Sequence, residues 1–162
     1  WGDPAVGWVW CVAAGRDAIG RRLAVVFHRG NNKDFSRIGR PYLFLYLDGE
    51  LMKTFLGEAV DLHFFWTAAP ERLPILPGAL ASVFSYRKVH APARLEISAR
   101  DDADELSLVM EVEARSEIIL PDYQDKQYTF LKELNGSVRA AFRLRGQTGA
   151  CQNGSFYAEY VH

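Results

Sequence analysis

The sequence has no excess of charge of either sign and no long apolar run. Its 19 Lys and Arg residues are matched by 20 Asp and Glu residues, mixed along 162 positions, so the net charge is −1. A basic stripe is what neutralises a phosphate backbone, and its absence argues against nucleic acid as a partner. No apolar run reaches the roughly 18 residues needed to span a membrane, and the first residues lack a secretory signal pattern. We therefore expect a cytoplasmic chain with no nucleic-acid partner and no membrane span.

Cysteine is scarce as well. Cys11 and Cys151 stand far apart, without Cys-x-x-Cys or Cys/His clustering, so a structural zinc site is not expected. First and last strands can be neighbours in a closed barrel, where the two thiols could pair, but two unpaired small hydrophobic residues are the preferred interpretation. No metal site is expected either, because no histidines accompany the carboxylates of Glu111, Glu113 and Glu117. A glycine-rich phosphate loop and a Gly-x-Ser-x-Gly elbow are also absent.

The composition is that of one globular domain. Hydrophobic residues make up 49% and charged residues 24% of the chain. This length can bury a single core. We therefore treat residues 1–162 as a single domain.

The dominant hydrophobic period is two. Leu106, Leu108 and Met110 head an apolar face that continues to Ile118, and polar residues alternate with them, as in a half-buried strand. Glu111, Glu113, Arg115 and Glu117 are interpreted as a solvated outer face that pairs with Arg139, Arg143 and Arg145 on the next strand. About ten strands are predicted in all, at residues 6–13, 21–27, 42–47, 51–55, 60–67, 81–89, 94–100, 106–118, 136–144 and 155–161.

The segments between these strands favour hairpins. Asp48-Gly49 and Asn135-Gly136 are strong two-residue turn signals, and residues 101–104 form a polar connection. Residues 30–41 and 70–78 are predicted as longer loops that could flank a barrel mouth, and residues 125–134 could form a short helical turn. Sequential antiparallel pairing, closed or nearly closed into a barrel, is the simplest arrangement.

Both ends of the chain resemble a known family. Trp1-Gly2-Asp3, then Trp8-Val9-Trp10 and the apolar segment 23–27, with the closing Gly-x-aromatic segment at 154–161, resemble the C-terminal lipocalin-like domain of the group that contains hydroxyneurosporene synthase (carotenoid 1,2-hydratase), AttH-type proteins and lipocalin-like pericyclases. The resemblance implies an all-β, antiparallel lipocalin-like (calycin) β-barrel of about 8–10 strands. It further implies that the chain binds a hydrophobic isoprenoid or polyene and promotes hydration, cyclisation or pericyclic rearrangement without a cofactor. An N-terminal lipocalin-like domain is the implied partner, and a homo-oligomer is the alternative.

Aromatic residues are candidates for the ligand site. Trp8 and Trp10 project to the same side of their strand, and with Phe64 and Trp66 they could line a cavity by stacking and shape. The competing interpretation is ordinary barrel core. His28 and Tyr86 complete the expected ligand-binding set.

Three residues are candidates for chemistry. His63 sits among apolar residues that would disfavour its charged form and leave a neutral imidazole for proton transfer, although a hydrogen-bonded structural histidine is common. Asp61, two positions away and hence on the same face, could orient His63 or act as an acid. Asp3 belongs to the Trp-Gly-Asp turn, where the resemblance implies a carboxylic acid that protonates an alkene; an Asx turn before Pro4 is the alternative.

Two further functions compete with the enzyme. The same barrel could carry or sense an apolar ligand without chemistry, or it could be a structural half of a larger enzyme.

Overall fold

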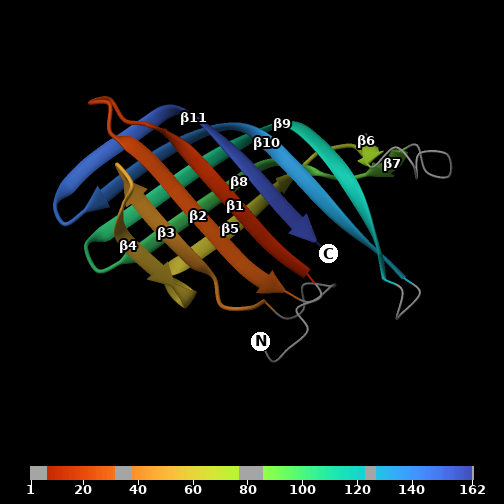
Figure 1. Ribbon diagram of the computed structural model, residues 1–162, viewed down its shortest axis with the longest axis horizontal. Coiled ribbons are helices and arrows are strands. Elements are labelled where there is room, and N and C mark those ends of the chain that lie inside the picture. Colours follow the sequence, from red (N-terminus) through yellow and green to blue (C-terminus); the bar gives the residue numbers. More distant parts are fainter. Residues whose placement is uncertain (1–6, 32–37, 77–85, 123–126, 162) are drawn as a thin grey trace.

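The computed structural model describes residues 7–31, 38–76, 86–122 and 127–161 of the chain. Apart from the short 3-10 helix η1 (Gly57–Ala59), its regular elements are all strands (Figure 1). They are β1 (Gly7–Arg16), β2 (Arg22–Asn31), β3 (Tyr42–Leu47), β4 (Glu50–Leu56), β5 (Val60–Trp66), β6 (Glu71–Leu76), β7 (Tyr86–Val89), β8 (Pro92–Asp101), β9 (Asp104–Asp122), β10 (Gln127–Leu144) and β11 (Gln147–Val161).

The strands form one curled sheet that does not close. The order β4-β3-β2-β1-β11-β10-β9 continues at one end of β9 into β8 and β5, and at its other end into β6 and β7. All pairings are antiparallel except the short one between β6 and β9. Within the described residues β4 and β5 follow each other in the chain but do not pair, so they are the two edges of a half-barrel. The all-β, antiparallel, lipocalin-like prediction is confirmed.

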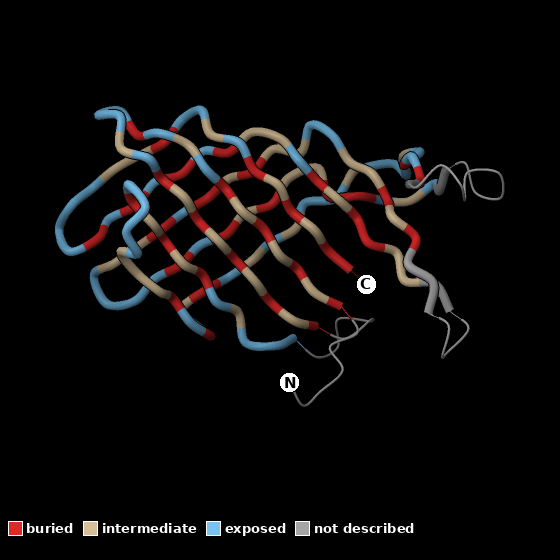
Figure 2. The backbone as a smooth tube through the Cα atoms, viewed as in Figure 1, coloured by how far each residue is buried: buried red, intermediate tan, exposed pale blue. Residues whose placement is uncertain are grey.

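Strict alternation places the core on the concave face. In β1 to β3, every second residue is buried (Figure 2). Cys11, Phe27 and Leu45 are such residues, and all three belong to one hydrophobic cluster. Fully burying a side chain such as Phe27 stabilises the fold by about 1.5–3 kcal/mol. The core therefore lies on the inner face of the curled sheet.

Two-residue turns join three pairs of neighbouring strands, β3–β4, β8–β9 and β10–β11. Asp48 and Gly49 have positive φ angles of 52° and 92°, as a type I′ hairpin between β3 and β4 requires. Arg145, which was predicted to pair with the carboxylates of the preceding strand, instead forms the same kind of turn with Gly146 between β10 and β11, with φ angles of 48° and 79°. The predicted connection at 101–104 joins β8 to β9, with Asp102 at a φ of 54°.

Asn135-Gly136 is not a turn, which corrects the prediction. Both residues lie inside β10, opposite a β-bulge in β9 where Glu113 is the extra residue between Val112 and Ala114. A Cβ on Gly136 would lie 2.0 Å from the carbonyl oxygen of Glu111. The glycine is therefore needed for a close backbone approach rather than for chain reversal. Since β10 begins at Gln127, the helical turn expected over 125–134 is also wrong for residues 127–134.

Two further predictions concern the loop at residues 70–78 and the two cysteines. β6 lies within the stretch predicted as the loop 70–78; Pro74 is tolerated because β6 pairs with β9 only through Ile75 and Leu76. Cys11 and Cys151 are both buried and unpaired, which confirms the preferred interpretation.

Candidate functional site

Trp8 and Trp10 lie on the convex face of the sheet. Val9 and Cys11, their neighbours in β1, face the core, so the two tryptophans face outward. The Trp10 ring meets the edge of Tyr157 at 6.1 Å between centroids. The two tryptophans therefore neither line a cavity on the concave face nor belong to the core, because the alternation in β1 places the smaller Val9 and Cys11 inside. Asp3 lies outside the described residues.

His28 is on the same convex face. Its ring stacks on Tyr42 with centroids 5.3 Å apart and planes 7° from parallel. Burial lowers the pKa of His28, which favours the neutral imidazole at neutral pH. Its Nδ1 is buried without a hydrogen-bond partner in the part of the chain that the structure describes.

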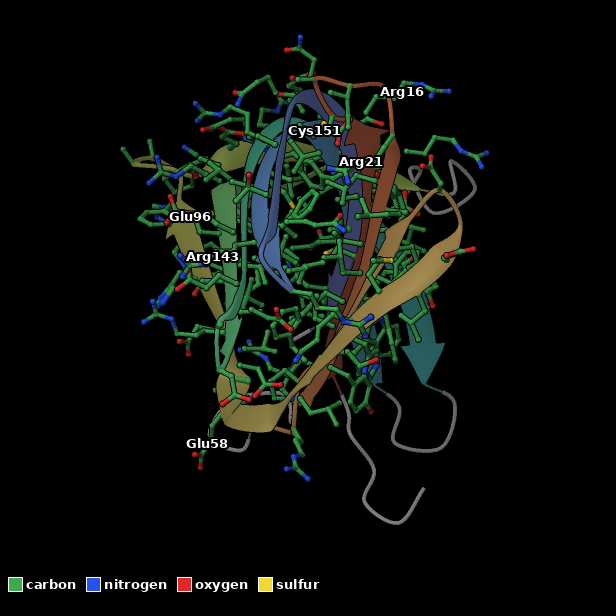
Figure 3. The ribbon with its side chains drawn as sticks, turned by 90° about the vertical axis from the view of Figure 1, so that its left-hand side faces the viewer. Arg16, Arg21, Glu58, Glu96, Arg143 and Cys151 are labelled. Carbon is green, nitrogen blue, oxygen red and sulfur yellow. The ribbon has the colours of Figure 1, made fainter. Side chains whose placement is uncertain are left out.

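His63 and Asp61 share a face, as predicted, but that face is the outer one. They lie exposed on β5, opposite Glu96 and Ser98 of β8. In Figure 3, Glu96 projects outward from the sheet. The apolar neighbours Leu62 and Phe64, which suggested a buried histidine, occupy the opposite face of the strand.

Phe64 and Trp66 point to the concave face. Phe64 packs against the core, and its ring lies 5.6 Å from that of Trp66. Both rings contact Tyr160 of β11, at centroid distances of 5.7 and 6.1 Å. These two predicted ligand-binding residues are therefore brought together with a residue that the sequence analysis had not selected. Tyr86 pairs with Pro74 through its backbone, and its side chain lies outside the described part.

Tyr160 belongs to a row of polar residues across the concave face. Successive registers join Glu117 of β9 to Lys132 of β10, Lys132 to Tyr160, Tyr160 to Val9 of β1, and Val9 to Arg29 of β2. We call Glu117, Lys132, Tyr160 and Arg29 the inner polar row. It stands inside a face that is otherwise mainly apolar.

The bulge in β9 is what turns Glu117 inward. Before the bulge, the buried residues are Leu106, Leu108 and Met110; after it, the buried residues include Glu117 and Ile119. One extra residue reverses the alternation, because successive side chains of a strand point to opposite faces. The sequence analysis carried a single alternation through the whole segment and therefore placed Glu117 outside.

Lys132 and Glu117 form a buried ion pair. Their side chains are 1% and 0% exposed, and the Lys132 Nζ lies 3.5 Å from the Glu117 Oε1. The same Nζ stands 4.9 Å from the centre of the Tyr160 ring, in cation–π contact. Buried ionisable pairs of this kind occur often at functional sites, although structural networks also contain them.

Arg29, at the far end of the row, has no such counterpart. The residue is 9% exposed, and its Nε is buried without a hydrogen-bond partner among the described residues. Burial lowers the pKa of the guanidinium. No carboxylate of the described part lies within ion-pair distance of it.

Arg29 lines a groove at the open seam of the sheet. This seam groove of about 910 Å³ lies where β4 and β5 fail to pair. Its apolar wall includes Leu56, Val60 and Leu62, and its rim includes Arg40, Glu58 and the predicted candidate Asp61. Leu62 and Phe64 lie on the same face of β5, so the groove's apolar wall leads toward the Phe64–Trp66 pair.

A second hollow, of about 830 Å³, shares Glu58 and Asp61 with the seam groove. Its charges are matched: Arg100 and Arg143 both bind Glu105, Arg143 at 3.0 Å. Figure 3 shows Glu58 and Arg143 directed away from the sheet. The two hollows therefore differ in charge, since the uncompensated buried cation faces only the seam groove.

Neither a metal site nor a spanning helix is found among the described residues. They contain no group of three or more His, Cys, Asp or Glu side chains placed to hold a metal ion. They also contain no helix with the length and apolarity needed to cross a membrane.

Comparison with known proteins gives matches only at the level of structure. No family model and no curated protein matches the sequence. Kievitone hydratase from Nectria haematococca is similar at 9% identity and a TM-score of 0.49, over 96% of this chain and 47% of that one. An AttH-like protein from Nitrosomonas europaea is similar at 10% identity and a TM-score of 0.43, over 96% of this chain and 50% of that one.

This chain thus spans about half the length of either structure. At these scores the fold class rests on the coordinates themselves, as an open antiparallel half-barrel with a polar row inside. The particular family stays a prediction.

Proposed function

We propose that this domain binds a hydrophobic small molecule, an isoprenoid or a polyketide-derived polyene, on its concave face and promotes its cofactor-free hydration, cyclisation or rearrangement. The observation that carries the proposal is the inner polar row, whose Tyr160 contacts both Phe64 and Trp66. An apolar interior with a few convergent polar groups is the usual composition of a small-molecule site.

The groups present suit proton transfer to an unsaturated bond. In a hydration, the oxygen of a water molecule bonds to one carbon, and the proton it loses passes to the Glu117 carboxylate. The other carbon receives a proton from the Lys132 ammonium. The Lys132–Glu117 contact of 3.5 Å then returns the proton, so that one water is added and the protein is unchanged.

The aromatic rings supply the other part of the chemistry. Positive charge that develops on a polyene is stabilised by the faces of Phe64, Trp66 and Tyr160. For a cyclisation, the same rings hold a flexible chain in its reactive shape, which lowers the entropic part of the barrier. Asp3, His63 and Asp61 stay predicted catalytic residues from the sequence analysis, and Trp8, Trp10, His28 and Tyr86 stay predicted ligand contacts. Of these, Asp61 lines the seam groove, whereas His63, Trp8, Trp10 and His28 lie on the outer face of the sheet.

The second candidate function is that of a carrier, because the Lys132–Glu117 ion pair is buried. With Lys132 and Glu117 at 1% and 0% exposure, a ligand that contacts only Trp66, which is 47% exposed, would bind without reaching them. Such a chain would hold an apolar molecule and release it unchanged. A structural half of a larger enzyme would bind no ligand alone.

The deciding experiment is incubation with a panel of polyenes followed by recovery and mass analysis. The enzyme proposal predicts an isomer or a product with one added water, and a rate that falls about 10²- to 10⁴-fold in Glu117→Gln, the range typical of a lost acid or base. Glu96→Gln, on the outer face of β8, is the matched control and should keep the rate.

Two outcomes contradict the enzyme. Polyenes that bind and return unchanged would establish the carrier instead. Absence of binding by every member of the panel would exclude both ligand functions for this domain alone.

A further inference from the structure

Arg29 is the one charged side chain of the inner polar row without a partner in the described part of the chain. Across the same face, Lys132 is matched by Glu117, and Arg115 is matched by Glu71. Arg29 lines the seam groove, and the residue is nine-tenths buried. Burying a cation without a partner costs free energy, because the cation loses its hydration. A bound anion that pairs with the cation recovers most of that free energy.

The carboxylates of the groove do not fill this role. Glu58 and Asp61 are exposed at the rim, and neither lies within ion-pair distance of Arg29. Figure 3 shows Glu58 directed away from the sheet. Solvent screens charges placed in this way. The groove therefore offers an apolar wall and one buried positive charge to a ligand.

We propose that Arg29 binds the carboxylate of an amphipathic ligand whose apolar chain occupies the seam groove against Leu56, Val60 and Leu62. The inference rests on the proposed function and narrows its substrate class to carboxylic acids with an extended apolar tail. The planar guanidinium presents donors in a fork that matches the two oxygens of a carboxylate, and its buried Nε is one of these donors.

A singly charged head is favoured over a phosphate. One buried cation balances one negative charge: Arg40, the other cation of the groove lining, is exposed at the rim, and Lys132 is already balanced by Glu117. A phosphate monoester or diphosphate carries more charge and would bring an uncompensated anion into the groove. Alkyl phosphates therefore serve as a separate arm of the test.

The test uses cis-parinaric acid, a fluorescent polyene fatty acid, with its methyl ester as the uncharged equivalent. The unmodified protein should bind the acid at least about tenfold more tightly than the ester, since hydrogen bonds to a charged group are worth about 1.5–3 kcal/mol. In Arg29→Met the preference should disappear through weaker binding of the acid, with ester binding kept. Arg139→Met, on the outer face of β10, is the control and should keep the preference.

The outcomes separate this inference from the proposed function. Equal binding of acid and ester by the unmodified protein, or a preference that survives in Arg29→Met, would overturn the role of Arg29 while leaving a hydrophobic ligand site. Binding of neither compound would overturn both. Displacement of the acid by dodecyl phosphate in preference to laurate would overturn the carboxylate.

If Arg29→Met does not fold, Arg29→Gln can replace it, because glutamine is polar but uncharged. The ratio of acid affinity to ester affinity in the unmodified protein can be measured without any variant. Arg29→Lys should retain part of the preference, because a lysine keeps the charge but loses the fork.

Discussion

The two halves of the β9–β10 ladder have the same antiparallel pairing, but their inward-facing side chains differ in polarity. In the half that ends at Val112, the inward residues are apolar and fully packed, with Leu108 and Met110 at 1% and 0% exposure. In the half that begins at Arg115, the inward pair is Glu117 and Lys132. The boundary between the two is the bulge at Glu113, opposite Asn135 and Gly136.

The difference teaches that one inserted residue can change the chemistry of a sheet's interior without changing its topology. Hydrogen bonding continues on both sides of the bulge, from Arg143 to Gln127 of β10. What changes across the bulge is which residues of β9 point inward: the even-numbered ones before it and the odd-numbered ones after it. The apolar half supplies stability through burial, and the polar half supplies the groups proposed here for function.

The largest effect is expected from Lys132→Met. Removal of the ammonium leaves the buried Glu117 without its partner charge, and breaking a buried pair in this way typically costs about 3–5 kcal/mol. The free energy of unfolding from urea denaturation checks this value. The double variant Lys132→Met/Glu117→Leu should regain much of the loss, because both charges are then absent; a double variant no more stable than the single one would contradict the pairing.

A slightly smaller loss is expected in the apolar half. Met110→Ala removes a fully buried side chain and leaves a cavity, which typically costs about 2–5 kcal/mol. In contrast to Lys132→Met, no second substitution across the ladder should restore it by removing charge. A loss below about 1 kcal/mol, within the range of surface substitutions and small adjustments, would show that this half is loosely packed.

Gly136→Ala tests the bulge that separates the halves. The new Cβ would lie 2.0 Å from the Glu111 carbonyl oxygen and 2.9 Å from the Glu113 nitrogen, so the backbone must shift. We expect a loss of about 1–3 kcal/mol, the usual cost of overpacking, measured by thermal unfolding. Asn135→Ala, at the adjacent exposed position, is the control and should change stability little; equal losses in the two variants would contradict the close approach.

At neutral pH the smallest effect is that of the Cys11 thiol, whose ionisation changes stability only in alkaline solution. Burial raises the pKa of Cys11 from 9.0 to about 12, against the weaker opposing effect of a backbone hydrogen bond from Phe27. Between these two values the unfolded chain loses the proton while the folded chain keeps it. Stability from this group is thus complete below pH 9 and falls as the pH rises toward 12, by up to about 1.4 kcal/mol per pH unit.

The measurement is the free energy of unfolding at several pH values in this range, compared between the unmodified protein and Cys11→Ala. The difference between the two should shrink or reverse as the pH rises. Parallel curves would show that the thiol ionises equally in both states.

The strands and their partners follow from local patterns in the sequence. Alternation along 42–47 and 94–100 marks half-buried strands, and Asp48-Gly49 has the positive φ angles that its turn requires. The face that each strand buries is harder to predict. In β1, both faces carry apolar residues, Trp8 and Trp10 on one and Val9 and Cys11 on the other. The two-residue hydrophobic alternation alone does not show which face of the strand is buried.

The candidate site depends on information that no local pattern holds. Glu117 and Lys132 meet because of a bulge whose glycine resembles a turn residue in the sequence. Arg29 and Tyr160 join them through the pairing of the first strand with the last. One signal was present: Ser116 interrupts the apolar alternation between Ala114 and Ile118. The structure has the bulge just before this point, where Glu113 and Ala114 are both exposed. Two successive exposed positions in a long strand are what a bulge produces.

The unpaired edges of β4 and β5 have a consequence for how this domain could change over evolution. The two strands are joined only by the three residues of η1, where Gly57 adopts a φ of 61° beneath the side chain of Arg40. In a closed barrel, a wider interior demands a new strand number or shear. Here, lengthening or shortening one connection alters the width of the opening and leaves every ladder of the sheet intact. The width of the opening and the stability of the fold can therefore be selected separately, each by its own mutations.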